Sequence, residues 1–143
     1  MQIKRMGWRV GALTIVIATC LAMGCAPSRD ENLPETAPVY GVVTLKGEKL
    51  PEGTVRFLPE NPLANPASGM ILADGSFKLS TYERHDGAAL GKHKVTVIVE
   101  PRLDGSSPDP PFLIPKRYQS EKTTPLEVEI VKGKRNEVVF DLD

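Results

Sequence analysis

The chain has 143 residues, of which 41% are apolar and 25% are charged, and its formal net charge is zero. This length and apolar content suit one domain with a core of its own. The first 24 residues carry three basic residues and no acid, so the remainder has 15 basic and 18 acidic residues, a net charge of −3. A weakly acidic domain has no electrostatic basis for binding nucleic acid, which we therefore do not expect as a partner.

The first 24 residues have the layout of a bacterial secretory signal peptide. Residues 1–9 are short and basic, and residues 10–24 form a run of 15 residues without a charge. Such signals combine a basic start, an apolar stretch of about 7–15 residues and small residues before the cleavage site. A retained spanning helix, which needs about 20 apolar residues, is the less favoured alternative. We therefore predict that residues 1–24 are removed.

A cysteine follows the apolar run. Residues 21–25, LAMGC, resemble the lipobox of bacterial lipoproteins, although Ala22 stands three residues before the cysteine, where Leu is usual. Gly24, directly before Cys25, is as the motif requires. The resemblance implies that the Cys25 thiol is diacylglycerylated, that Cys25 becomes the first residue, and that fatty acyl chains such as palmitate hold the protein in a membrane. An ordinary secreted protein with a spare thiol is the alternative.

Lipidation at Cys25 would leave the mature chain without a free thiol. Cys20, the other of the two cysteines, departs with the signal peptide, so the domain is expected to be stabilised by burial alone. Two or three acyl chains give stable anchoring, at about 0.8 kcal/mol per buried CH₂. Ala26 stands in place of the Asp that favours inner-membrane retention in well-studied bacteria. We therefore expect the outer membrane, with the domain facing the periplasm or the cell surface.

Residues 25–38 are predicted to form the lipidated cysteine and a flexible linker. Between residues 26 and 38 the sequence has three prolines, four charges and one large aliphatic residue, Leu33. Such a segment spans about 20 Å as a coil and up to ~40 Å as polyproline II. Pro34 and Pro38 oppose the alternative of a helical arm. The linker would hold the domain away from the bilayer.

Residues 39–143 are predicted to form a single all-β domain. Short runs alternate apolar and polar residues between turn-forming segments, which indicates half-buried strands. The Asp-Gly pair at residues 74–75 predicts a hairpin with a type I′ turn, which requires positive φ at both positions. Two packed sheets would bury the apolar faces, so we expect a seven-stranded β-sandwich without a helix. The strands expected are 39–45, 54–58, 70–72, 77–79, 92–99, 126–130 and 138–142.

Three segments in order resemble carboxypeptidase regulatory-like domains: residues 41–57, residues 74–77 (Asp-Gly-Ser-Phe) and residues 91–97. The chain departs from that pattern at His93, where Tyr is usual, and at Lys49, where Pro is more frequent. It is also similar to small lipoproteins abundant in planctomycete-type bacteria, which share segments like 114–118 and 138–142. The resemblance covers residues 39–143 and implies a transthyretin-like, immunoglobulin-like sandwich with a non-catalytic role.

The alternation also assigns side chains to the two faces of the strands. Val55 and Phe57 are expected to point inward and Arg56 outward. His93 shares the parity of Val95, so it is expected at the start of a core-facing row. His93 and His85 are the only histidines, and zinc needs three or four clustered ligands. We therefore expect no metal and no cofactor.

A serine hydrolase site is considered and rejected. Ser80, His85 and Asp86 supply the residue types of a catalytic triad, but closeness in sequence is no evidence for its geometry. The chain also lacks the strand–Ser–helix elbow that exposes such a nucleophile. We interpret residues 82–91 as a connecting loop and expect no enzymatic activity.

Residues 101–125 contain six prolines and an apolar, aromatic centre that includes Phe112, Ile114 and Tyr118, with the basic Lys116 and Arg117 close by. One interpretation is a recognition loop that presents Phe112 and Tyr118 to a glycan or a protein. The other is a strap whose Phe112 and Ile114 cover one end of the sandwich and leave Lys116 and Arg117 in water. Burial of large apolar side chains, at about 1.5–3 kcal/mol each, favours the strap. A mixture of the two, with Tyr118 exposed, also remains open.

These observations predict a non-enzymatic, lipid-anchored module of the cell envelope that is structural or contacts other proteins. Its expected partners are the membrane, through the lipid, and envelope proteins or polysaccharide. A carbohydrate-binding surface module is the alternative. It would need exposed coplanar aromatics, and loss of Trp8 with the signal peptide leaves three Tyr and four Phe.

Overall fold

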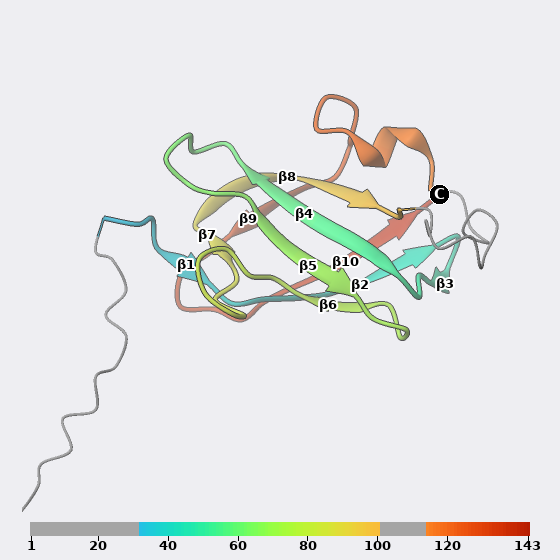
Figure 1. Ribbon diagram of the computed structural model, residues 1–143, viewed down its shortest axis with the longest axis horizontal. Coiled ribbons are helices and arrows are strands. Elements are labelled where there is room, and N and C mark those ends of the chain that lie inside the picture. The colour runs from blue at the N-terminus through green and yellow to red at the C-terminus, as the bar shows by residue number, and fades with distance from the viewer. Residues whose placement is uncertain (1–31, 101–113) are drawn as a thin grey trace, which may run out of the picture.

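The computed structural model describes residues 32–100 and 114–143, which form a β-sandwich of two four-stranded sheets (Figure 1). In the first sheet β2 pairs with β10, β3 and β6; the second has the order β5-β4-β8-β9, and β1 pairs separately with β7. The strands are β1 (Thr36–Ala37), β2 (Val39–Leu45), β3 (Glu48–Lys49), β4 (Gly53–Pro59), β5 (Ala67–Ile71), β6 (Ser76–Lys78), β7 (Ala88–Ala89), β8 (Gly91–Ile98), β9 (Glu127–Ile130) and β10 (Asn136–Leu142). The signal peptide and Cys25 lie outside the described residues.

The all-β sandwich prediction is confirmed. Among the described residues, seven strands are at least three residues long, and each overlaps one of the seven predicted strands. The three two-residue strands β1, β3 and β7 were not predicted, because they are too short for an alternation to show. One 3₁₀ turn, η1 (Lys116–Gln119), is the only helical element in the described part of the chain.

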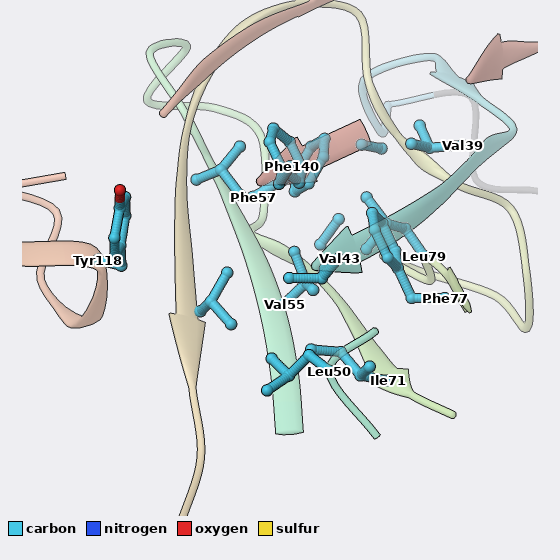
Figure 2. Close-up of a cluster of buried hydrophobic side chains, with 14 of the residues drawn as sticks. Val39, Val43, Leu50, Val55, Phe57, Ile71, Phe77, Leu79, Tyr118 and Phe140 are labelled. Carbon is cyan, nitrogen blue, oxygen red and sulfur yellow. The ribbon is translucent and has the colours of Figure 1, made fainter. Parts of the chain in front are cut away.

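Three phenylalanines from three strands fill the space between the sheets (Figure 2). The ring centroid of Phe57 in β4 lies 6.3 Å from that of Phe77 and 6.0 Å from that of Phe140. Phe77 and Phe140 stack at 6.3 Å. Val55 and Phe57 are fully buried and Arg56 is exposed, as the alternation predicts. Burial of each such side chain contributes about 1.5–3 kcal/mol to folding.

The first and last long strands of the domain, β2 and β10, pair in parallel. Their register runs from Val39 opposite Asn136 to Leu45 opposite Leu142, so both strands begin at one end of the sandwich and finish at the other. A parallel pair needs a long crossover, and here nearly the whole domain lies between the two strands. Strand periodicity predicts each strand but does not reveal this pairing.

The Asp-Gly turn differs from the predicted one. Gly75 has a φ of +78° but Asp74 does not have a positive φ, so the type I′ prediction is wrong. The Gly75 N–H donates to the Leu72 carbonyl oxygen at 2.8 Å, and the Leu72 N–H donates to that of Ser76 at 2.9 Å. This is a three-residue loop with Gly75 in the left-handed region. The flanking strands then diverge, since β5 pairs with β4 and β6 pairs with β2.

The end of the predicted linker is part of the domain. Thr36 and Ala37 form β1, which pairs with Ala88 and Ala89 of β7, and only 4% of Ala37 is exposed. The Leu90 N–H also donates to the Glu35 carbonyl oxygen at 3.0 Å. The linker prediction is therefore wrong for its last residues. A Thr-Ala pair opposite an Ala-Ala pair is too short and too weakly apolar to give a strand signal in the sequence.

Candidate functional site

A basic cleft lies at one end of the sandwich. We call this the linker end; it is the end at which strands β1, β2 and β10 begin (Figure 1). The cleft has a volume of about 740 Å³. Residues 35–38 form one wall and residues 132–135 of the β9–β10 turn form the other, with Tyr40 and Lys78 between them. Four cationic side chains and one carboxylate, Glu35, line this space.

Tyr40 lies between two of these cations. The guanidinium carbon of Arg135 lies 4.4 Å from the centroid of the Tyr40 ring, and Nζ of Lys78 lies 5.7 Å from it. The sheet register explains this arrangement. Tyr40 is opposite Lys78 in β6 on one side, and on the other side it is opposite Glu137, the second residue of β10. Cations over an aromatic face are stabilised by its quadrupole. The Tyr40 ring therefore holds two positive charges close together.

Only part of the positive charge in the cleft is neutralised within the protein. Nζ of Lys132 lies 2.8 Å from a carboxylate oxygen of Glu35, and Nε of Arg135 lies 3.1 Å from one of Glu137. In residues 32–100 and 114–143, neither Lys78 nor Lys134 is within ion-pair distance of a carboxylate. The cleft therefore keeps an excess of positive charge and is suited to an anionic ligand.

Asn136 holds the two walls of the cleft in place. Its Oδ1 accepts a hydrogen bond from the Val131 N–H at 3.1 Å, and its Nδ2 donates to the Lys134 carbonyl oxygen at 3.3 Å. Nδ2 also lies 3.4 Å from the Pro38 carbonyl oxygen in the opposite wall. One side chain thus fixes the basic turn and joins it to the segment that leads into β2.

This cleft is not predicted by the sequence. The run Lys132-Gly133-Lys134-Arg135 is its one local signal, and such a run also suits an exposed turn. Glu35, Tyr40 and Lys78 join it only through the pairing of β2 with β6 and β10. Because these contacts connect distant parts of the chain, no motif could reveal them.

Lys116, Arg117 and Tyr118 of the predicted contact surface lie at the opposite end of the sandwich, near Asp143. Phe112, the other predicted residue, is outside the described residues. Tyr118 is only 3% exposed and Ile114 only 5%, and both belong to the core cluster. Lys116 and Arg117 are exposed. In its described part the segment is therefore a strap. The expectation of an exposed Tyr118 is wrong, because η1 turns this ring toward β8 and the core (Figure 2).

Asp143 fixes the strap to the end of β10. The Tyr118 hydroxyl donates a hydrogen bond to the Asp143 carboxylate, and Nη2 of Arg117 lies 2.6 Å from the same carboxylate oxygen. The bond from Tyr118, and secondly that from Arg117, hold the pKa of Asp143 below its ordinary value. The guanidinium also lies over the Tyr118 ring, 4.9 Å from its centroid. The side chain of Arg117 thus has a structural role although it is exposed.

His93 faces the core, as its parity predicts, and is 1% exposed. Its Nε2 lies 2.7 Å from the Ala89 carbonyl oxygen, and its buried Nδ1 has no hydrogen-bond partner. Nε2 is therefore assigned as the donor. Desolvation lowers the pKa of His93.

Glu60, Glu127 and Glu129 line a cavity of about 180 Å³ beside His93. Among the described residues no three His, Cys, Asp or Glu side chains are placed to hold a metal ion.

The residues of the rejected triad have structural partners in the loop. The Ser80 hydroxyl oxygen accepts a hydrogen bond from the main-chain N–H of His85 at 2.8 Å. The Asp86 carboxylate accepts from the main-chain N–H groups of Thr81, at 2.7 Å, and Tyr82, at 3.1 Å. The prediction of a connecting loop is confirmed for residues 82–87, where these side chains close a turn between β6 and β7. It is wrong for the end of the range, because Ala88–Ala89 form β7 and β8 begins at Gly91.

The fold and the basic cleft at the linker end together define an all-β sandwich with a positively charged site at one end. Comparison of the chain with protein families, curated proteins and solved structures finds no match. In the part of the chain that the structure describes, none of the helical segments is long and apolar enough to cross a bilayer.

Proposed function

We propose that this protein is a lipid-anchored, non-enzymatic β-sandwich of the bacterial cell envelope that acts as a structural or protein-contact module. The lipid is attached to the thiol of Cys25, which becomes the first residue when the signal peptide, residues 1–24, is removed. Residues 26–34 then connect the anchor to the domain.

The position of β1 is the observation that carries this proposal. β1 is paired with β7, and Glu35 is joined to Lys132, so the chain from Cys25 meets the sandwich at a fixed place, the linker end. Strands β2 and β10 run away from that end toward Asp143 and the strap. An anchor at Cys25 would therefore leave the strap, with Lys116 and Arg117, available to other molecules of the envelope.

The aromatic side chains support the protein-contact role over carbohydrate binding. A sugar-binding platform needs exposed aromatic faces, but Tyr118 is buried and the Tyr40 ring lies beside Arg135 and Lys78. The edge strand β5 instead carries an exposed Met70, and Leu72, which follows it, is also exposed. Exposed apolar side chains beside a strand edge suit contact with another protein.

The anchor is tested by mass analysis of the N-terminal peptide of the natural mature protein. We expect a chain that starts at Cys25 and carries acyl mass. Cys25→Ser should abolish the acyl mass and release the protein from the membrane fraction, whereas Cys20→Ser, the matched control, should change neither. A mature chain that starts elsewhere or has no acyl mass would contradict the proposal. Crosslinking in intact cells then identifies the protein contacts.

A further inference from the structure

We propose that the basic cleft binds the phosphate headgroups of an anionic membrane surface, so that the linker end of the sandwich lies against the bilayer that holds the anchor. This inference rests on the proposed lipidation of Cys25. It adds a second attachment to the membrane, made by the folded domain itself.

The charges of the cleft suit phosphate. Lys78 and Lys134 are outside ion-pair distance of any described carboxylate, and an ammonium group can donate three hydrogen bonds. The ion pairs of Lys132 and Arg135 are open to solvent, with 70% and 66% of the two side chains exposed. Each of these cations therefore keeps donors free, and phosphate can bind without displacing Glu35 or Glu137.

The geometry of the cleft favours a surface over a deep pocket for a small molecule. Its cations come from the β6 strand and from the β9–β10 turn, which flank the half-buried Tyr40 of β2. Several headgroups can therefore be contacted at once. Each Lys or Arg near an anionic bilayer raises membrane affinity about fivefold.

The linker gives the membrane a further advantage over soluble anions. Nine residues separate Cys25 from Glu35, which lies in the wall of the cleft, so the cleft stays within about 35 Å of the anchor. Attachment through a short linker turns binding into an intramolecular event with a high effective concentration. A cleft too weak to recruit a free protein can therefore be occupied in the anchored one.

The experiment uses the natural acylated protein inserted into vesicles of phosphatidylcholine alone or with phosphatidylglycerol. Lysines are acetylated briefly and the extent at each is measured by mass spectrometry. We expect acetylation of Lys78, Lys132 and Lys134 to be several-fold slower on the phosphatidylglycerol vesicles, and the difference to disappear at high salt. Lys122, which is exposed and distant in the fold, should react equally on both.

Variants separate the cleft from general charge effects. Lys134→Gln should reduce the protection of Lys78 and Lys132 about fivefold, whereas the matched control Lys122→Gln should leave it unchanged. Equal acetylation on the two vesicle types would overturn the proposal. So would protection seen only in intact cells, which would indicate an envelope partner. Protection by free glycerol phosphate on phosphatidylcholine vesicles would overturn the membrane source in favour of a soluble phosphate.

Failure of the lipid anchor is distinguished from failure of the cleft. If the natural mature protein has no acyl mass, the proposed function fails, and that unacylated protein is sedimented with the same two vesicle types. Binding to phosphatidylglycerol vesicles alone, weakened by Lys134→Gln and not by Lys122→Gln, would still support the headgroup site. Equal sedimentation with both vesicle types would overturn it, because in a protein without an anchor the cleft alone would have to recruit the protein to the membrane.

Discussion

Gly87 and Ala37 lie so close that a Cβ on Gly87 would stand 2.5 Å from the Ala37 carbonyl carbon, and closer still to its oxygen. Gly87 also has a φ of +89°, which L side chains rarely adopt. Only glycine therefore lets β1 reach β7. This contact decides whether the segment that precedes β2 is held by the domain.

Gly87→Ala should destabilise the protein by about 2–4 kcal/mol, because it adds a backbone clash to the strain of a positive φ. Gly133→Ala is the matched control, since Gly133 has a φ of +73° but nothing within 4 Å of a Cβ. The control should cost about 1–2 kcal/mol. Urea unfolding measures both. Equal losses would show that the approach of Ala37 is not the constraint.

Phe57→Ala should cost about 3–5 kcal/mol, because it removes the ring that contacts both Phe77 and Phe140 and leaves a cavity between the sheets. That loss is a large part of the stability of a typical domain, so the milder Phe57→Leu is measured beside it. Val139→Ala, at an exposed position of β10, should change stability by less than about 0.5 kcal/mol. An unfolding midpoint that Phe57→Ala leaves unchanged would contradict this packing.

Acid should weaken the fold through His93. Its pKa is lowered in the folded state, so below the unfolded pKa of about 6.5 the unfolded chain binds a proton that the folded chain does not. The free energy of unfolding should therefore fall as pH drops from about 6.5 toward the folded pKa, by at most about 1.4 kcal/mol per pH unit. Unfolding in urea at a series of pH values measures this slope.

His93→Gln keeps a donor for the Ala89 carbonyl oxygen and removes the titration, so its stability should depend less on pH in that window. His85→Gln, at an exposed loop position, should keep the dependence of the wild type. An unchanged slope in His93→Gln would place the acid sensitivity elsewhere in the molecule.

The contacts of Asp143 with the strap should make the stability of the fold depend on pH in the acidic range. The pKa of Asp143 is lowered by Tyr118 and Arg117, so its contribution is present above the unfolded pKa of about 3.8 and is lost as pH falls through the lower folded pKa. Tyr118→Phe and Asp143→Asn should both lower the melting temperature at pH 7 and reduce the further loss in acid. Glu121→Gln, in an exposed turn, is the control. A melting temperature that neither variant changes would mean that Asp143 does not hold the strap.

Residue alternation predicted much of the fold, because inward positions such as Val55 and Phe57 repeat every second residue whatever the neighbouring strand. It did not predict which strands pair. The Asp74-Gly75 turn is an example, because its two flanking strands belong to different sheets. The local sequence of a turn does not determine which sheet each flanking strand joins. The same limit explains why β1 was assigned to the linker.

The two ends of the sandwich were predicted unequally. For the strap, the apolar residues around Ile114 indicated burial, but only the contact with Asp143 shows why the polar Tyr118 is also buried. For the basic cleft, the sequence shows Lys132 and Lys134 as a basic run, but it does not show that Tyr40 lies next to them in the fold. A site built from turns of distant strands is defined by tertiary pairing, which single-sequence patterns do not encode.

The parallel pairing of β2 with β10 has a consequence for how the chain folds. Contacts between the first and last long strands give a high contact order, which slows folding because a large loop must close first. Until Asn136–Leu142 is in place, one edge of β2 has unpaired backbone groups and invites pairing with other chains. A chain cut before β10 is therefore expected to aggregate, and the full polypeptide would need protection until its last strand is in place.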